Sequence, residues 1–151
     1  SSVSVYICKK NNFLSNLKKL KHYDEILIEK FIPGREIQVA ILGNEKLGAI
    51  ELKPKRMFYD YEAKYNSQNT QKIKIEDESI VKRLKEISEK VFDCLNCKTW
   101  ARVDFVSEGE KLAVIEINSV PGFTAKSLFP LAAKYSGIEY KELISLIIED
   151  C

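Results

Sequence analysis

The stretch Trp100–Ser127 reads WARVDFVSEGEKLAVIEINSVPGFTAKS, which is two runs patterned as β-strands around a short turn. Side chains alternate between faces along a strand, so Arg102 and Asp104 are expected to share one face of the first run. Glu116 and Asn118 are expected to share one face of the second, where a buried strand would carry Val or Ile. If the two faces coincide, three side chains with oxygen ligands lie beside one guanidinium. Such a set suits Mg²⁺ that is held together with substrate phosphates.

The dipeptide Pro121-Gly122 follows the second run and ends it abruptly. Glycine lets backbone N–H groups come close to a ligand, and proline cannot continue a ladder of hydrogen bonds. A pair of edge strands with a polar outer face is the alternative, because antiparallel sheets commonly have one solvated face. That alternative explains the alternation but not the Pro-Gly break. We therefore interpret the stretch as a site for phosphate chemistry.

Length and composition indicate one or two small domains. The chain has 151 residues, 45% hydrophobic and 30% charged, with a formal net charge of +2. This is enough to bury a core, and without a concentrated basic stripe nucleic acid is not favoured as a partner. No apolar run approaches the roughly 18 residues of a membrane span, and no signal peptide is recognised. The opening Ser-Ser-Val, without an initial Met, suggests a fragment of a longer protein.

The four cysteines include a CxxC pair, Cys94 and Cys97, which invites a zinc or redox interpretation. Zinc would need a second pair, whereas Cys8 and Cys151 are isolated near the two ends. A redox CxxC is expected between a strand and a following helix, but this one follows a helix and precedes a strand. Ordinary reduced thiols of a cytoplasmic protein are the simpler interpretation.

Hydrophobic periodicity predicts an α+β fold, a mainly antiparallel sheet with flanking helices. Residues 1–34 are expected to form one unit, strand–helix–strand, and residues 35–151 a second unit. Strands are predicted at residues 3–8, 25–32, 35–42, 47–52, 72–75 and within 100–118, and helices at residues 13–20, 80–95, 127–135 and 140–148.

The joint between the two units resembles an adenine pocket. Lys30 and Ile32 carry backbone groups that could read an adenine edge, and Phe31 offers an apolar wall. Glu29 could accept from an exocyclic amine, and Glu36 from ribose hydroxyls. An edge strand that ends in a turn with solvated charges is the alternative, since glutamates are normally exposed. The local sequence leaves both interpretations open.

Residues 54–69 form a long segment without a regular period, rich in aromatic and charged residues. A connection of this length is usually a functional lid or a disordered connector. Its aromatic content argues against disorder.

Four blocks together resemble the ATP-grasp superfamily, and within it the D-alanine–D-alanine ligase family. They are EKFIPGRE (29–36), FYDYEAKY (58–65), WARVDF (100–105) and EINSVPGFTAKSLFP (116–130). The resemblance covers nearly the whole chain, and FYDYEAKY is its most specific block, because it distinguishes this family from other ATP-grasp enzymes. It implies joining of two D-alanines with ATP through an acyl phosphate, for peptidoglycan, cell wall biogenesis and cell shape.

The resemblance also implies roles for nucleotide and metal. Residues Glu29, Lys30, Phe31 and Ile32 would line the adenine pocket, and Glu36 would hold the ribose. Asp104, Glu116 and Asn118 would hold two Mg²⁺ ions, or Mn²⁺ in their place, which bridge the phosphates of ATP.

The remaining implied roles concern the two D-alanines. Arg102 and the backbone N–H of Gly122 would stabilise the oxyanion that forms when the amine attacks. Ser127, with the Leu128 backbone, would hold the carboxylate of the second D-alanine. Lys64 would bind phosphate or that carboxylate, and Tyr65 on the closing lid would favour the dipeptide as product.

The chain departs from the family at its start. The family's phosphate-covering loop runs Gly-Ser-Ser-Val-Gly, whereas here Ser1–Val3 is followed by Ser4. The amino-terminal domain and the upstream lysines that grip phosphates are missing. We therefore expect residues 1–34 to be a remnant of the central lobe, residues 35–151 to be the carboxy-terminal catalytic lobe, and the isolated chain to be inactive. The resemblance allows a homodimer of the full-length enzyme. A non-catalytic nucleotide-binding remnant and another ATP-grasp carboxylate–amine ligase remain as alternatives.

Overall fold

The computed structural model describes residues 4–43, 45–54 and 70–149. Its centre is a five-stranded sheet in the order β3-β2-β1-β4-β5, in which every neighbouring pair is antiparallel. The strands are β1 (Arg35–Leu42), β2 (Glu45–Pro54), β3 (Thr70–Lys74), β4 (Trp100–Glu108) and β5 (Lys111–Asn118). The helices are α1 (Phe13–Lys19), α3 (Glu78–Cys94), α4 (Leu128–Tyr135) and α5 (Tyr140–Glu149).

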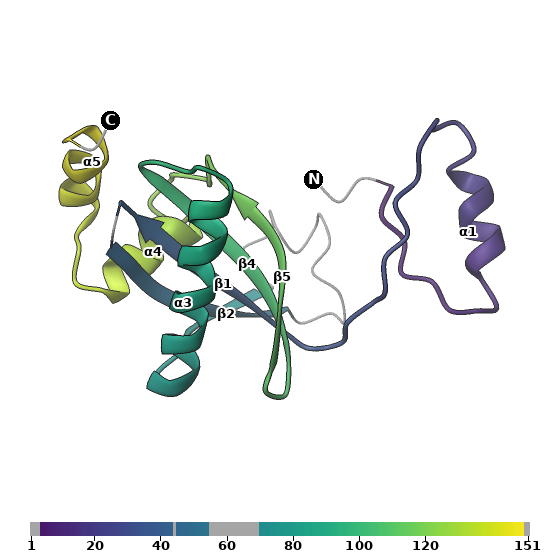
Figure 1. The fold of residues 1–151 in the computed structure, drawn as a ribbon, viewed down its shortest axis with the longest axis horizontal. Coiled ribbons are helices and arrows are strands. Elements are labelled where there is room, and N and C mark those ends of the chain that lie inside the picture. Colours follow the sequence, from purple (N-terminus) through teal and green to yellow (C-terminus); the bar gives the residue numbers. More distant parts are fainter. Residues whose placement is uncertain (1–3, 44, 55–69, 150–151) are drawn as a thin grey trace.

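Helices cover both faces of the sheet, and the alternation of side chains along β1 explains why. Ile37, Val39 and Ile41 pack in one buried cluster with α3. Ala40 and Leu42 belong to a second cluster, with α4 and α5 on the opposite face. Figure 1 shows α3 on one side of the sheet and α4 on the other. A central strand buried on both faces needs apolar residues at nearly every position, which residues 37–42 supply apart from Gln38.

Most predicted elements are confirmed, with boundaries that differ by a few residues. The strand predicted at residues 47–52 extends to Glu45–Pro54, and the one at 72–75 lies at Thr70–Lys74. The long amphipathic helix predicted at 80–95 is α3, which begins four residues after the last residue of β3. The predicted α+β architecture is therefore present from Arg35 onward.

Two predicted strands are wrong. The described part of the run at residues 3–8, and the whole of the run at 25–32, have no strand in the structure, although α1 forms between them. Their apolar side chains are exposed, by 40% for Ile7 and 81% for Leu27. A strand needs a partner for its backbone N–H and C=O groups, and all five strands of the sheet lie after Gly34. β-patterned sequence without a partner strand therefore forms no strand here.

Gly34 marks the entry into the sheet. A Cβ atom at this position would clash with the backbone carbonyl of Ser107 on β4 and would lie 2.9 Å from Cγ1 of Val106. Only glycine allows the chain to approach β4 this closely before it enters β1. In Figure 1 the segment before this point, with α1, lies apart from the sheet. In the described part of the chain, no helix has the length and apolar character that crossing a bilayer requires.

Candidate metal and acceptor site

The register of β4 and β5 brings the four polar residues of the sequence pattern onto one face. Arg102 is paired with Asn118, and Asp104 is paired with Glu116. An irregularity in the register follows Asp104, because Phe105 pairs with Val114 and leaves Ile115 as an extra residue on β5. A bulge of this kind shifts the alternation by one residue, so Glu116 faces the same side as Asp104 although Leu112 packs on the opposite side.

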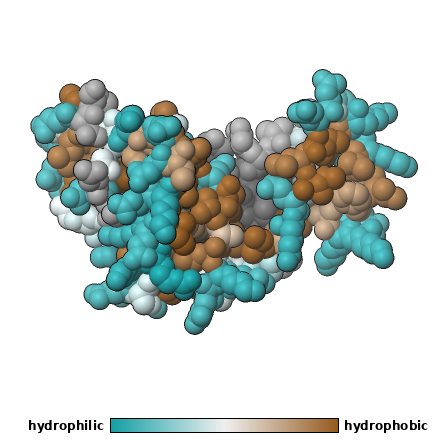
Figure 2. Space-filling model, in the orientation of Figure 1, coloured by the Kyte–Doolittle hydropathy of each residue, from teal (hydrophilic) through white to brown (hydrophobic). Residues whose placement is uncertain are grey.

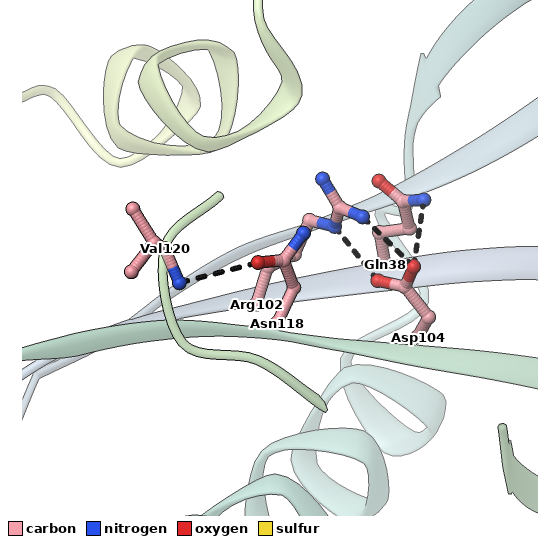
Figure 3. Close-up of polar contacts among 5 residues, drawn as sticks. All are labelled: Gln38, Arg102, Asp104, Asn118 and Val120. Carbon is pink, nitrogen blue, oxygen red and sulfur yellow. Dashed lines mark hydrogen bonds and ion pairs between the residues drawn. The ribbon is translucent and has the colours of Figure 1, made fainter. Parts of the chain in front are cut away.

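Asp104 is the buried centre of this face, with 5% of its surface exposed. Arg102 donates from Nε to Oδ1 at 2.7 Å and from Nη2 to Oδ2 at 2.9 Å, a two-pronged ion pair. Gln38 on β1, opposite Asp104 in the register, donates from Nε2 to Oδ2 at 3.3 Å. Figure 3 shows the three side chains converging on one side of the sheet. These contacts hold the carboxylate in a single orientation.

Asn118 and Glu116 are more accessible. Oδ1 of Asn118 accepts from the backbone N–H of Val120 at 3.2 Å, a turn that closes the end of β5 (Figure 3). An amide oxygen has a second lone pair, so this bond leaves Asn118 one acceptor position for a ligand. The Glu116 carboxylate is exposed. It can therefore move to meet a cation without a large loss of contacts.

The donor set fits a magnesium ion that shares its coordination with phosphate. Within the described residues, no group of three or more His, Cys, Asp and Glu side chains could hold a metal. Two carboxylates and one amide are present instead, from Asp104, Glu116 and Asn118. Mg²⁺ typically takes one or two carboxylates and completes its octahedron with water and substrate phosphates. The residues thus suit a cation that arrives with a nucleotide rather than a permanent structural metal.

The loop after β5 brings Gly122 and Ser127 together. A Cβ atom on Gly122 would lie 3.2 Å from Oγ of Ser127, tighter than an ordinary contact. The Ser127 hydroxyl accepts from the backbone N–H of Thr124 at 3.0 Å and lies 2.9 Å from the Thr124 hydroxyl. Ser127 precedes α4 as its N-cap, but its side chain makes no capping hydrogen bond. The hydroxyl therefore belongs to the loop, next to the open N-terminal turn of α4.

An aromatic cluster fixes this loop (residues 119–127). We call it the acceptor loop, because the family resemblance implies that it binds the second, accepting D-alanine. The Phe123 ring packs against Trp100 at 5.1 Å between centroids and against Tyr140 at 5.5 Å. The Tyr140 hydroxyl also donates to the carbonyl of Phe123 at 2.8 Å. On the other side, the Lys72 ammonium donates to the carbonyl of Lys126 at 2.6 Å, and burial lowers the pKa of Lys72. The loop is thus tied to β3, β4 and α5.

The predicted adenine pocket is not enclosed by the described residues. Glu29, Lys30, Phe31 and Ile32 have no regular structure and are exposed. Glu36 lies at the start of β1, half-buried, two positions before Gln38 on the same face. The predicted site residues Lys64 and Tyr65 lie outside the described residues. Leu128 is half-buried at the first position of α4.

Sequence reasoning missed Gln38 and Lys72. The signal for Gln38 was present, since Glu36 and Gln38 alternate with apolar residues on one strand. Lys72 gave no signal, because its carbonyl partner, Lys126, lies 54 residues away in the sequence. A shallow surface hollow lined by Lys74, Glu78 and Lys85 lies beside α3, on the opposite face of the sheet. None of the residues that line it is a predicted site residue, so we regard the β4–β5 face as the site.

The chain is similar to a known protein family over nearly its whole length. A family model described as "D-ala D-ala ligase C-terminus" matches residues 1–149. The D-alanine–D-alanine ligase of Pelagibacter ubique is 50% identical over 153 aligned positions, which cover 99% of this chain and 50% of that protein. That of Aquifex aeolicus is 41% identical and covers 87% of this chain and 46% of its own length. The chain spans about half the length of the curated relatives it matches.

Solved structures give the same result. A D-alanine–D-alanine ligase from Bacillus anthracis, complexed with ATP, superposes with a TM-score of 0.79 at 33% identity, over 95% of this chain and 48% of that one. VanG D-Ala:D-Ser ligase from Enterococcus faecalis has a TM-score of 0.76 at 25% identity, over 93% of this chain and 43% of that one. The predicted ATP-grasp fold is confirmed by these likenesses. The chain belongs to the D-alanine–D-alanine ligase family, and it matches the carboxy-terminal part that the family model describes.

Proposed function

We propose that this chain provides the metal-binding and acceptor-binding part of an enzyme that joins two D-alanines with ATP. The observation that carries the proposal is the pairing of Asp104 with Glu116 and of Arg102 with Asn118 in a chain of this family. The carboxylate of the first D-alanine would attack the γ-phosphoryl group of ATP, which forms an acyl phosphate and releases ADP. The amine of the second D-alanine would then displace phosphate. The product would serve peptidoglycan synthesis.

In this proposal Asp104, Glu116 and Asn118 hold Mg²⁺, or Mn²⁺ in its place. The cation supplies charge neutralisation at the phosphates, which is what phosphoryl transfer needs most. Glu29–Ile32 and Glu36 contact the nucleotide, and Lys64 binds phosphate. The buried orientation of Asp104 supports its role, because a carboxylate held by Arg102 and Gln38 needs no reorganisation when the cation binds.

The acceptor loop supports the second half of the reaction. The first turn of α4 begins at Leu128, and the Ser127 hydroxyl lies beside it without capping the helix. N–H groups at a helix N-terminus attract anions, so Ser127 and the Leu128 backbone are suited to an acceptor carboxylate. Arg102 and the N–H of Gly122 stabilise the oxyanion of the tetrahedral adduct. Tyr65 contributes to closure of the site and to the choice of D-alanine as acceptor.

A second candidate is a ligase of the same family with another acceptor. Its support is the likeness to VanG, a D-Ala:D-Ser ligase, at a TM-score of 0.76. The higher identity to the Pelagibacter ligase, 50%, favours D-alanine. Product analysis with D-alanine, D-serine and D-lactate in competition separates the acceptors.

The test is a chimera in which residues 1–149 replace the matched half of the Pelagibacter ligase. The chimera is a protein of full length, whereas this chain by itself spans about half of that length. We expect D-alanyl-D-alanine and phosphate to appear together when ATP, Mg²⁺ and D-alanine are all present, and neither when one is omitted. A folded chimera that binds ATP without forming dipeptide would favour a non-catalytic nucleotide-binding role instead.

A further inference from the structure

Gln38 has a buried amide oxygen with nothing to bond to among the described residues. Only 4% of the residue is exposed, and its Oε1 atom has no hydrogen-bond partner there. The register places Gln38 between Asp104 on β4 and Ile50 on β2, and Ile50 is apolar. Buried amide oxygens in native proteins nearly always accept a hydrogen bond from the protein, from water or from a ligand. The unpaired Oε1 atom therefore indicates a hydrogen-bond donor that is not among the described residues.

The orientation of the amide follows from its neighbour. A carboxylate paired with a guanidinium only accepts hydrogen bonds, so Gln38 must present its NH₂ group to Asp104. The opposite orientation would set two oxygens against each other. Oε1 is consequently turned away from the Asp104 carboxylate, on the side of the sheet where the Arg102 guanidinium lies (Figure 3).

The donor must be small, because the side chain is almost completely buried, and the surroundings must attract it. Asp104 and, across the ladder, Glu116 carry two negative charges against the single positive charge of Arg102, and this net negative charge favours a cation that carries water. Mg²⁺ dehydrates reluctantly and keeps several water molecules when it binds a protein. We infer that Gln38 is a positioning residue for the cation: its Nε2 orients Asp104, and its Oε1 accepts a hydrogen bond from a hydrated divalent cation at Asp104 and Glu116. This inference rests on the proposed metal site.

A purely structural role makes a different prediction. In that case Gln38 only adds one donor to the Arg102–Asp104 pair, and its removal would lower stability without a specific effect on cations. Groups that orient metal ligands typically change metal affinity or activity by about 10- to 100-fold when they are replaced. Metal affinity, measured apart from activity, therefore separates the two roles.

The experiment is a titration of the 151-residue chain with Mn²⁺ in the presence of ATP, followed by electron paramagnetic resonance. The same titration of ATP without the chain is subtracted, because ATP itself binds Mn²⁺. We compare wild type with Gln38→Met, which keeps length but removes both polar groups, and with Glu116→Gln, which removes a proposed ligand. The matched control is Glu51→Gln. Glu51 is also buried, at 7%, but it pairs with Arg35 and lies in register with Ile37, on the face that packs against α3.

The expected result is a loss of Mn²⁺ affinity of about tenfold or more in Gln38→Met, with little change in Glu51→Gln. Loss of affinity in Glu116→Gln but not in a folded Gln38→Met would overturn the role of Gln38 and leave the metal site intact. Wild-type chain that fails to bind Mn²⁺, or a Glu116→Gln variant with unchanged affinity, would overturn the metal site and this inference together.

A second measurement on wild-type chain keeps the inference testable if Gln38→Met does not fold. The side-chain NH₂ signals of Gln38 can be followed by nuclear magnetic resonance while MgCl₂ is added with ATP. A hydrogen bond at Oε1 changes the polarisation of the whole amide, so these signals should shift in step with Mg²⁺ binding. Signals that stay in place while Mg²⁺ saturates the site would contradict the inference.

Discussion

Asp104 illustrates how much one residue depends on its partners. Its side chain is 8% exposed and that of Arg102 15%, so this ion pair is largely removed from water. Two parallel hydrogen bonds from one guanidinium give the pair a fixed geometry as well as attraction. Gln38 adds a third donor without adding charge. The same three contacts also fix the orientation of the carboxylate that we propose to bind a cation.

Arg102→Met is expected to destabilise the fold strongly, because it leaves the Asp104 carboxylate buried without its cationic partner. Breaking a buried pair in this way typically costs about 3–5 kcal/mol. Urea denaturation of the chain, followed by circular dichroism, measures the change in the free energy of unfolding. Added Mg²⁺ and ATP should recover part of the loss in the variant. A loss well below 1 kcal/mol would mean that Asp104 is solvated in solution, contrary to its burial in the structure.

Glu116→Gln is expected to abolish most ligase activity in the full-length chimera, while the fold remains intact. The exposed carboxylate contributes little to stability, but an amide cannot neutralise a cation at the phosphates. Phosphate release and dipeptide formation give the rate, and the melting temperature reports the fold. Glu51→Gln, the same chemical change on the opposite face, should retain activity. Near-normal turnover in Glu116→Gln would remove this residue from the site.

At the scale of elements, the site depends on how strands and loops are tied together. The bulge at Ile115 turns Glu116 toward Asp104, and the aromatic contacts of Phe123 fix the acceptor loop over β4. Lys72 on β3 also holds this loop, because its ammonium donates to the carbonyl of Lys126. On the opposite face, α3 packs against the sheet and holds β1 and β4 in place. The stability of α3 therefore contributes to the geometry of a site that it does not touch.

The N-cap of α3 gives a pH-dependent prediction. The Asp77 carboxylate accepts from the Ser79 hydroxyl at 2.7 Å and from the N–H groups of Ser79 and Ile80. The bond from the Ser79 hydroxyl, then that from the Ile80 N–H, lowers the pKa of Asp77 below its ordinary value of 3.8. A carboxyl with a lowered pKa in the folded state stabilises the fold above pH 3.8, and this contribution is lost as the pH falls through the folded-state pKa.

We therefore expect Asp77→Ala to lower the melting temperature at neutral pH, with a smaller difference from wild type at acidic pH. Asp77→Asn is the matched variant, because its side-chain oxygen still caps the helix but does not titrate. Its melting temperature should depend less on pH in the acidic range than that of wild type. An identical pH dependence in wild type and in Asp77→Asn would show that the cap does not titrate with folding.

At the scale of the molecule, residues before Arg35 differ from the rest. Neither buried cluster contains a residue from this described segment. Val5, Ile7, Leu27 and Phe31 are exposed, and Figure 2 shows hydrophobic surface gathered over this segment and at the β5 edge of the sheet. We propose that residues 1–34 and 35–151 are separate units with different stabilities, as the sequence predicts.

Hydrogen exchange tests this division. Backbone amides of β1 and β4 should be protected for long times, because both strands are paired on each side and buried. Amides of residues 25–32 should exchange rapidly, because their backbone groups have no strand partner. Mass spectrometry of the chain after exchange in D₂O gives both rates. Protection of residues 25–32 at the level of β1 would show that these residues pair after all.

The isolated chain is expected to bind Mn²⁺ with ATP but to form little or no dipeptide. It spans about half the length of its curated relatives, and catalysis by positioning needs the whole arrangement of groups around both substrates. Assay of phosphate release by the 151-residue chain at saturating ATP, Mg²⁺ and D-alanine measures this. Robust dipeptide synthesis would show that residues 1–151 contain a complete site.

Local pattern was sufficient for most of the sheet and its helices. Alternation predicted that Arg102 and Asp104 share a face, as do Glu116 and Asn118, and the register of β4 and β5 agrees. Helical periodicity located α3, and the family blocks identified the chain. These features depend on residues close together in the sequence, where the period of the backbone alone decides which side chains lie on one face.

Three features were decided only by the tertiary structure. The described residues of the runs at 3–8 and 25–32 have β-patterned sequence but form no strand. Pairing needs a second strand, and local alternation does not identify that partner. The bulge at Ile115 is a property of the ladder between β4 and β5, so it is visible only once the two strands are paired. Gln38 reaches Asp104 across 66 positions of sequence, and Lys72 reaches Lys126 across 54. The alternation of residues shows which faces are polar. Which polar groups meet depends on the packing of distant strands, because such contacts require a register and a burial that no single segment contains.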